Sequence, residues 1–259
     1  MTTTATSTIA LNNGVAMPAI GLGTYPLDDR EVAQTVLRAT GVGYRLIDTA
    51  AKYGNETGVG DGVRACGIPR EDLFVTTKLD GGNQGRDRAI PGLDASLRRL
   101  RLDYVDLLLI HWPLPWHDLY VDTWRTFEKI LATGKTRAIG VSNFKPAHLE
   151  RLAAGSDLVP AVNQIELNPG VGRVGAREYD AAHGIVTQAW SPLGRGELLS
   201  DRGHHRDRGA ARPNTGSGDR ALARPARRVG GAQVDERGQA GGQHRRFRFR
   251  PVRDRHARH

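Results

Sequence analysis

Four residues of this chain have side chains that together could deliver a proton to an oxygen atom. Tyr53 follows Asp48 in a glycine-rich turn, and Lys78 and His111 each follow a later apolar run. A phenol has an ordinary pKa of about 10, so Tyr53 can protonate a carbonyl oxygen only if a nearby charge stabilises its phenolate. A buried Lys78 ammonium would provide that charge, and Asp48 would keep the ammonium ionised and oriented.

His111 directly follows the apolar run 107–110 and is itself followed by Trp112. A neutral imidazole at this position could orient a carbonyl oxygen toward Tyr53. Each residue also has an ordinary structural interpretation: Asp48 as a helix cap, Lys78 as a solvated cation and His111 as a core residue. Their joint placement at the ends of consecutive predicted strands favours the catalytic interpretation.

The elements that would hold these residues alternate between strand and helix. We predict strands at residues 20–22, 46–47, 73–76, 105–110, 138–141, 162–165 and 185–187. Leu93, Leu97 and Leu100 have the three- and four-residue spacing of a helix, and similar patterns lie between the other strands. Before the first strand, the dipeptide Asn13–Gly14 predicts a β-hairpin turn, and we expect this hairpin to act as a plug.

The polar residues decide between a barrel and an open doubly wound sheet. Six consecutive strands each have a polar or aromatic candidate at their C-terminal end, namely Asp48, Lys78, His111, Ser142, Gln164 and Trp190. Six strand ends converge on one site only in a barrel, because an open sheet uses the strands beside its switch point. A dinucleotide fingerprint is also missing, since Gly23 is followed shortly by Pro26. We therefore predict an α/β protein with a (β/α)8 TIM barrel.

The formal net charge of +9 is unevenly distributed along the chain. Residues 1–199 hold 21 Lys and Arg against 22 Asp and Glu, whereas residues 200–259 hold 16 Arg against 6 acidic residues. The single Cys66 allows no internal disulfide, the polar start lacks the features of a signal peptide, and no apolar run reaches the ~18 residues of a membrane span. We expect a cytoplasmic monomer with no membrane partner and no need for nucleic acid.

Three segments carry a resemblance to a known family. Residues 43–60, residues 100–113 and residues 140–144 resemble the signature blocks of the aldo-keto reductases, in particular the prokaryotic type similar to diketogluconate reductase. The resemblance extends from residue 8 to about residue 199. It implies a barrel enzyme that transfers a hydride from NADPH to a small aldehyde or ketone, with no metal.

The resemblance also assigns roles to residues. It implies a catalytic set of Asp48, Tyr53, Lys78 and His111, in which Tyr53 is the proton donor. It implies a cofactor site formed by Gly23, Thr24, Ser142, Asn143, Gln164, Trp190, Ser191, Leu193 and Gly194. In that site the resemblance implies that Ser142, Asn143 and Gln164 bind the nicotinamide carboxamide. It implies that the indole of Trp190 stacks on the nicotinamide ring. Tyr25 and Trp112 match aromatic residues of the substrate pocket.

The resemblance stops after about residue 199. From residue 200 the large apolar residues are few and scattered, so we predict an Arg/Gly-rich disordered tail at 200–259 beside a barrel domain at 1–199. Shifting the reading frame of residues 231–237 by one base can give Ala-Pro-Lys-Ser-Thr-Asn, which is similar to the family's phosphate-binding block. We therefore interpret the tail as frame-shifted coding sequence. We expect the last strand and its flanking helices to be missing and the activity to be impaired.

A second functional interpretation stays open at this point. The barrel could be catalytically idle and bind nucleic acid through the basic tail, because Arg-rich segments neutralise phosphates.

Overall fold

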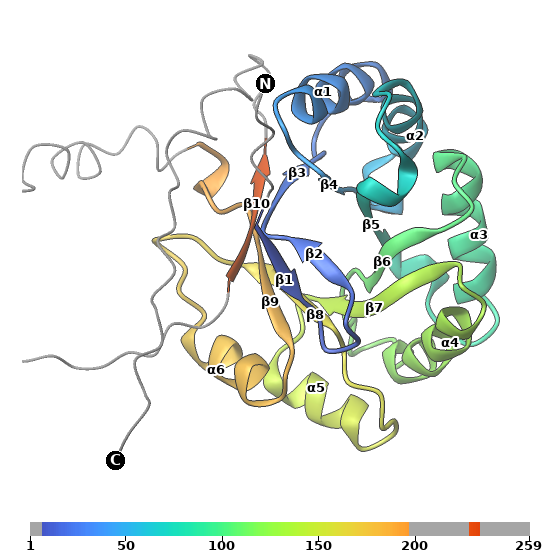
Figure 1. The fold of residues 1–259 in the computed structure, drawn as a ribbon. Coiled ribbons are helices and arrows are strands. Elements are labelled where there is room, and N and C mark those ends of the chain that lie inside the picture. Colours follow the sequence, from blue (N-terminus) through green and yellow to red (C-terminus); the bar gives the residue numbers. More distant parts are fainter. Residues whose placement is uncertain (1–6, 197–227, 234–259) are drawn as a thin grey trace, which may run out of the picture.

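The computed structural model describes residues 7–196 and 228–233. Strands β1 (Thr8–Ala10) and β2 (Ala16–Pro18) form an antiparallel hairpin with Ile9 opposite Met17. Met17 is fully buried against residues at the starts of barrel strands, among them Leu46 and Phe74. The hairpin therefore plugs the amino-terminal end of the barrel, as predicted (Figure 1).

Eight parallel strands form a closed barrel. In order around the barrel they are β10 (Arg228–Gln233), β3 (Ile20–Gly23), β4 (Leu46–Asp48), β5 (Phe74–Leu79), β6 (Val105–Ile110), β7 (Thr136–Ser142), β8 (Val162–Glu166) and β9 (Val186–Trp190). All residues of β5 and β6 are buried. Burial on both faces explains the uninterrupted apolar runs that predicted these strands.

The expectation that the last strand is missing was wrong. β10 pairs in parallel with β9 on one side and β3 on the other, so neither neighbouring strand keeps an open edge. The sequence of β10 gave little indication of a strand, because Val229 is its one large apolar residue. Pairing in a sheet uses backbone N–H and C=O groups, which a pattern of apolar side chains does not report.

The predicted disordered tail is thus interrupted by at least one strand. The rest of that prediction, including the missing flanking helices, falls on residues 197–227 and 234–259, which lie outside the described residues. The frame-shift interpretation rests mainly on those residues and stays a prediction.

Helices cover the outside of the barrel (Figure 1). They are α1 (Asp29–Gly41), α2 (Glu56–Ala65), α3 (Ala89–Leu100), α4 (Tyr120–Ala132), α5 (Pro146–Ala153) and α6 (Val174–Ala182), with short 3₁₀ turns η1 (Ala51–Tyr53), η2 (Arg70–Asp72), η3 (Gly81–Asn83) and η4 (Gly194–Gly196). Trp124 and Phe127 on α4 are fully buried in the layer between helices and strands. Within the described ranges, no helix is both long and apolar enough to cross a membrane.

Glycines let α2 lie close to both of its neighbours. A Cβ added to Gly58 would stand 2.0 Å from the backbone oxygen of Asp29 in α1, and one added to Gly60 would stand 2.0 Å from that of Leu100 in α3. Real side chains cannot approach backbone this closely, so these contacts require glycine. The close packing fixes α2 directly after the turn that carries Tyr53.

Candidate active site

The centre of the site is an ion pair between neighbouring strands. Asp48 ends β4 and Lys78 lies near the end of β5, so both side chains stand at the carboxyl end of the barrel. The Lys78 ammonium is 1% exposed; it pairs with Asp48 Oδ1 and donates to the backbone oxygen of Thr49 at 3.0 Å. Burial alone would lower the pKa of Lys78, but the charge of Asp48 and the hydrogen bonds to Asp48 and Tyr53 outweigh it and the pKa is raised. The ammonium therefore stays protonated.

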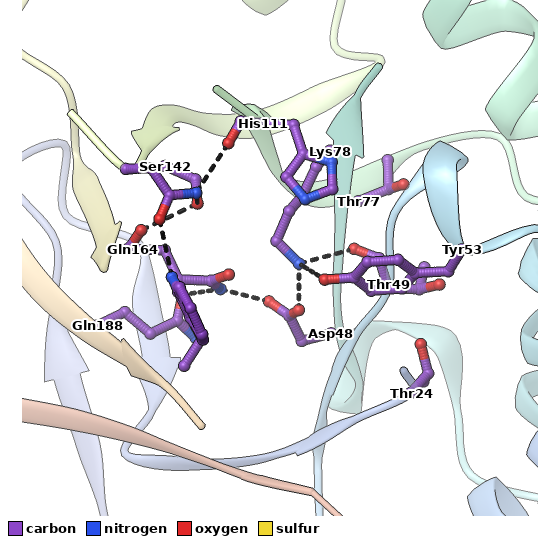
Figure 2. Close-up of polar contacts among 12 residues, drawn as sticks. Thr24, Asp48, Thr49, Tyr53, Thr77, Lys78, His111, Ser142, Gln164 and Gln188 are labelled. Carbon is purple, nitrogen blue, oxygen red and sulfur yellow. Dashed lines mark hydrogen bonds and ion pairs between the residues drawn. The ribbon is translucent and has the colours of Figure 1, made fainter. Parts of the chain in front are cut away.

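Tyr53 approaches this ammonium from the turn that follows β4. Its hydroxyl lies 3.3 Å from Lys78 Nζ, and Nζ lies 5.0 Å from the centre of its ring. Gly54, at φ 71°, ends the turn in the left-handed conformation that favours glycine. Tyr53 is only partly buried, and its hydroxyl points at the buried cation (Figure 2).

His111 lies directly after β6, and its ring contacts that of Tyr53. The two rings meet edge to face, with centroids 5.7 Å apart. Burial, together with the nearby Lys78 charge, lowers the pKa of His111 to about 3. The imidazole is therefore neutral near pH 7 and carries one N–H that can donate a hydrogen bond.

Amide and hydroxyl groups line the ends of the next strands. Ser142 Oγ donates to the backbone oxygen of Gln164 at 2.9 Å, and Asn143 Nδ2 donates to the backbone oxygen of His111 at 3.0 Å. The indole N–H of Trp190 donates to Asn143 Oδ1 at 2.9 Å. Asn143 has a φ of 65°, a left-handed conformation that asparagine tolerates better than most residues. These bonds connect β7, β8 and β9 at the same end as the ion pair.

Gln164 links the amide cluster to the ion pair. Its Nε2 donates to Asp48 Oδ2 at 2.6 Å, across the barrel interior, and to Gln188 Oε1 at 2.8 Å (Figure 2). Gln188 was missed in the sequence. Its signal was the strand period: Gln188 lies two residues before Trp190 on β9, and alternate residues share a face.

The remaining predicted residues surround this group less tightly. The Tyr25 ring is 52% exposed and lies 5.2 Å from the Tyr53 ring, and Trp112 is 48% exposed. Ser191, Leu193 and Gly194 form the turn after β9, where Ser191 has a φ of 48°. No hydrogen bond in the described part of the chain joins this turn to the ion pair.

Gly23 ends β3 and Thr24 follows it, beside the end of β4, where Thr24 N donates to the backbone oxygen of Asp48 at 3.0 Å. Thr24 is fully buried, and its Oγ1 has no hydrogen-bond partner among the described residues. A buried hydroxyl without a partner is costly, and a bound polar ligand would remove that cost. The orphaned hydroxyl, a partly exposed indole and a set of amides together fit a nicotinamide nucleotide.

The fold and this cluster define a parallel barrel enzyme whose chemistry lies at the carboxyl ends of the strands. The Aldo/keto reductase family model matches residues 19–230. An aldo-keto reductase of Mycolicibacterium vanbaalenii is 52% identical over 194 residues, which cover 75% of this chain and 70% of that protein. The glyoxal reductase of Bacillus subtilis is 46% identical over 202 residues, covering 78% and 72%.

A solved structure agrees with these relatives. The aldo-keto reductase of Bombyx mori, in complex with NADP, superposes with a TM-score of 0.67 at 39% identity and covers 71% of this chain and 66% of that one. The chain belongs to the aldo/keto reductase family and is an oxidoreductase. The predicted family and barrel are thereby confirmed.

Proposed function

We propose that this chain reduces a small aldehyde or ketone, with NADPH supplying the hydride and Tyr53 the proton. The observation that carries the proposal is the 3.3 Å contact between the Tyr53 hydroxyl and the buried Lys78 ammonium. A carbonyl carbon that accepts a hydride leaves negative charge on its oxygen, which must be protonated. The ammonium favours proton release from the adjacent phenol, because it stabilises the phenolate left behind.

His111 and Asp48 support this step in different ways. Neutral His111 can donate its single N–H to the carbonyl oxygen beside Tyr53 and so orient it. Asp48 holds Lys78 in place and compensates its charge, which would otherwise be costly to bury.

The cofactor site is part of the proposal. Gln164, Ser142 and Asn143 would hold the nicotinamide carboxamide, and Trp190 would stack on the ring. Gly23, Thr24, Ser191, Leu193 and Gly194 would border the rest of the nucleotide, with the Thr24 hydroxyl as a free partner. Tyr25 and Trp112 expose aromatic surface beside Tyr53 and would contact the carbonyl compound.

The oligomeric state, the cellular location and the independence from nucleic acid belong to the same proposal. We infer a monomer that works in the cytoplasm, an expectation that rests on the single Cys66 and the polar start of the chain. We also infer that the reaction needs no nucleic acid, because the proposed catalytic residues lie within residues 1–199, whose net charge is near zero. Electrophoretic mobility of a short RNA in low salt tests the last point, since non-specific binding is strongest there. Retention of the RNA by the chain would contradict it.

The experiment for the reaction combines binding and turnover. Quenching of tryptophan fluorescence measures NADPH affinity, and loss of nicotinamide absorbance with glyoxal or another small aldehyde measures turnover. The wild-type chain should bind and oxidise NADPH, whereas Tyr53→Phe should bind equally well but turn over at least ~100-fold more slowly. Equal rates for the two chains, or no NADPH binding by the wild type, would overturn the proposal.

A further inference from the structure

Two buried glutamines stand side by side on the inner faces of β8 and β9. Gln164 and Gln188 are direct partners in the parallel register and are 3% and 1% exposed. They belong to a continuous chain of polar contacts, in which Gln188 bonds Gln164, Gln164 bonds Asp48, and Asp48 pairs with Lys78 beside Tyr53 (Figure 2).

The chemistry of the partners fixes which way the Gln164 amide faces. A carboxylate only accepts hydrogen bonds, so the atom of Gln164 that faces Asp48 Oδ2 at 2.6 Å must be the nitrogen. A primary amide nitrogen has two hydrogens, and the second is directed at Gln188 Oε1 at 2.8 Å. Both donors are then used, and the remaining hydrogen-bonding atom of the Gln164 side chain is the acceptor Oε1.

A single anchor would leave the amide plane free to rotate about the bond to Asp48. The second anchor, from the neighbouring strand, defines that plane. An acceptor held in a defined direction can select a ligand that presents an N–H there, because a ligand without the N–H leaves the acceptor unpaired.

We propose that Gln188 is a positioning residue that fixes the Gln164 amide with its Oε1 directed to the N–H2 of the nicotinamide carboxamide. The proposal rests on the proposed NADPH-dependent function. Gln188 itself acts through Gln164 and needs no contact with the cofactor. The alternative is that Gln188 only fills space between β9 and its neighbours.

The first test uses the full chain without cofactor. Gln188→Met keeps the length of the side chain but removes the acceptor, and Thr187→Val on the outer face of β9 is the matched control. In the wild type both side-chain amide protons of Gln164 should exchange slowly with solvent, as seen by NMR. In Gln188→Met one of them should exchange ~10-fold faster, which corresponds to the loss of one hydrogen bond. Unchanged exchange in Gln188→Met, or equal acceleration in Thr187→Val, would overturn the proposal.

The second test measures selection of the carboxamide by fluorescence quenching. The probes are NADPH and its acetylpyridine analogue, in which a methyl group replaces the amide NH2. Gln188→Met should weaken NADPH binding about 5–10-fold and leave the analogue within about twofold, because the lost interaction involves only the amide. Gln188→Glu keeps an acceptor and should stay within about threefold of the wild type for both probes.

The outcomes separate the two proposals. Equal weakening of both probes by Gln188→Met, or no weakening of either, would overturn the positioning role. A wild-type chain that binds neither probe would overturn the proposed function. The exchange experiment would in that case still decide whether Gln188 orients Gln164.

Discussion

Asp48 and Asp106 are both buried carboxylates on barrel strands, but they lie at opposite ends of the barrel. Asp48 is the last residue of β4, whereas Asp106 is the second residue of β6. Asp106 is fully buried and accepts from the backbone N–H of Val75 at 2.8 Å, from Arg70 at 2.7 Å and from Arg137 at 2.8 Å.

The two carboxylates differ in what their cations do. Arg70 and Arg137 both direct a guanidinium nitrogen at Asp106 and are partly exposed to solvent, so their charge is shared between the carboxylate and water. Lys78 is almost completely buried and has a further contact, with the Tyr53 hydroxyl. The ion pairs of Asp106 therefore link β6 to β7 and to η2 at one end of the barrel. At the other end the ion pair of Asp48 and Lys78 lies beside the hydroxyl that we propose as the proton donor.

The amino-terminal end also has a cavity of about 520 Å³, lined in part by Arg45, Glu71 and Phe74. This cavity is separate from the residues around Lys78, and its lining includes the Asp106 partner Arg137. It does not contain the combination of a phenol, an ammonium and a neutral imidazole. We therefore assign the chemistry to the carboxyl end on the basis of the side chains present.

Removing the Tyr53 hydroxyl should give the largest effect, and it should affect activity alone. We expect Tyr53→Phe to lower kcat/KM about 100- to 10,000-fold, the usual contribution of a positioned general acid. Thermal unfolding should change little, because the hydroxyl is at the partly exposed edge of the ion pair. A large drop in Tm together with the loss of activity would show that Tyr53 is part of the scaffold, like Arg70.

Asp106→Asn should have the opposite pattern. The free energy of unfolding should fall by about 3 kcal/mol, because Arg70 and Arg137 lose the negative charge that they pair with. In addition, the new side-chain N–H2 group would face a guanidinium, and neither group can accept a hydrogen bond from the other. Once folded, the variant should keep kcat/KM within about threefold. Urea unfolding and steady-state kinetics measure the two quantities.

Asp94→Asn is the matched control for Asp106→Asn. It breaks an ion pair with Lys135 whose two side chains are 33% and 42% exposed, so the change in stability should stay within about 1 kcal/mol. If the two variants lose equal stability, burial does not explain the importance of Asp106.

The residues at the carboxyl end of the barrel, which we call the reactive end, were more predictable from the sequence than the closure of the barrel. Asp48, Lys78 and His111 each follow an apolar strand pattern, and parallel topology brings such residues together. β10 could not be found in this way, because backbone pairing with β3 and β9 defines it. Gln188 was missed for a related reason: its spacing from Trp190 shows that the two share a face of β9, but its role depends on Gln164, the partner opposite it on β8.

His111 allows a pH test of the reactive end. The fold favours the neutral imidazole and lowers its pKa from 6.5 to about 3, so its contribution to stability is fully present above pH ~6.5 and is lost as the pH falls toward 3. Between pH 7 and pH 4.5 the wild type should lose about 2 kcal/mol more than His111→Gln. Urea unfolding of both chains across this range measures the difference. Parallel curves would show that His111 is protonated in the folded state as readily as in the unfolded chain.

The smallest predicted effect concerns a third buried carboxylate, which lies outside the barrel. Asp180 on α6 is fully buried, and it accepts from Asn163 at 3.1 Å and from Thr187 at 2.8 Å. Asn163 and Thr187 directly precede Gln164 and Gln188 on β8 and β9. Alternation along each strand therefore places the Asp180 contacts and the glutamine pair on opposite faces.

Unlike Asp48 and Asp106, Asp180 has no cation in hydrogen-bond contact among the described residues, and burial raises its pKa from 3.8 to about 6. The fold thus favours the protonated acid, and the stability this gives is present below pH ~3.8 and is lost as the pH rises through 6. Relative to Asp180→Asn, the wild type should lose about 1–2 kcal/mol between pH 4 and pH 6.5, with no further change up to pH 8. The sign is opposite to that for His111, so urea unfolding over one pH series separates the two groups.

A wild type that instead gains stability relative to Asp180→Asn over this range would mean that Asn163 and Thr187 stabilise the carboxylate more than burial destabilises it. Asp180 would then resemble Asp106, with neutral donors in place of the arginines.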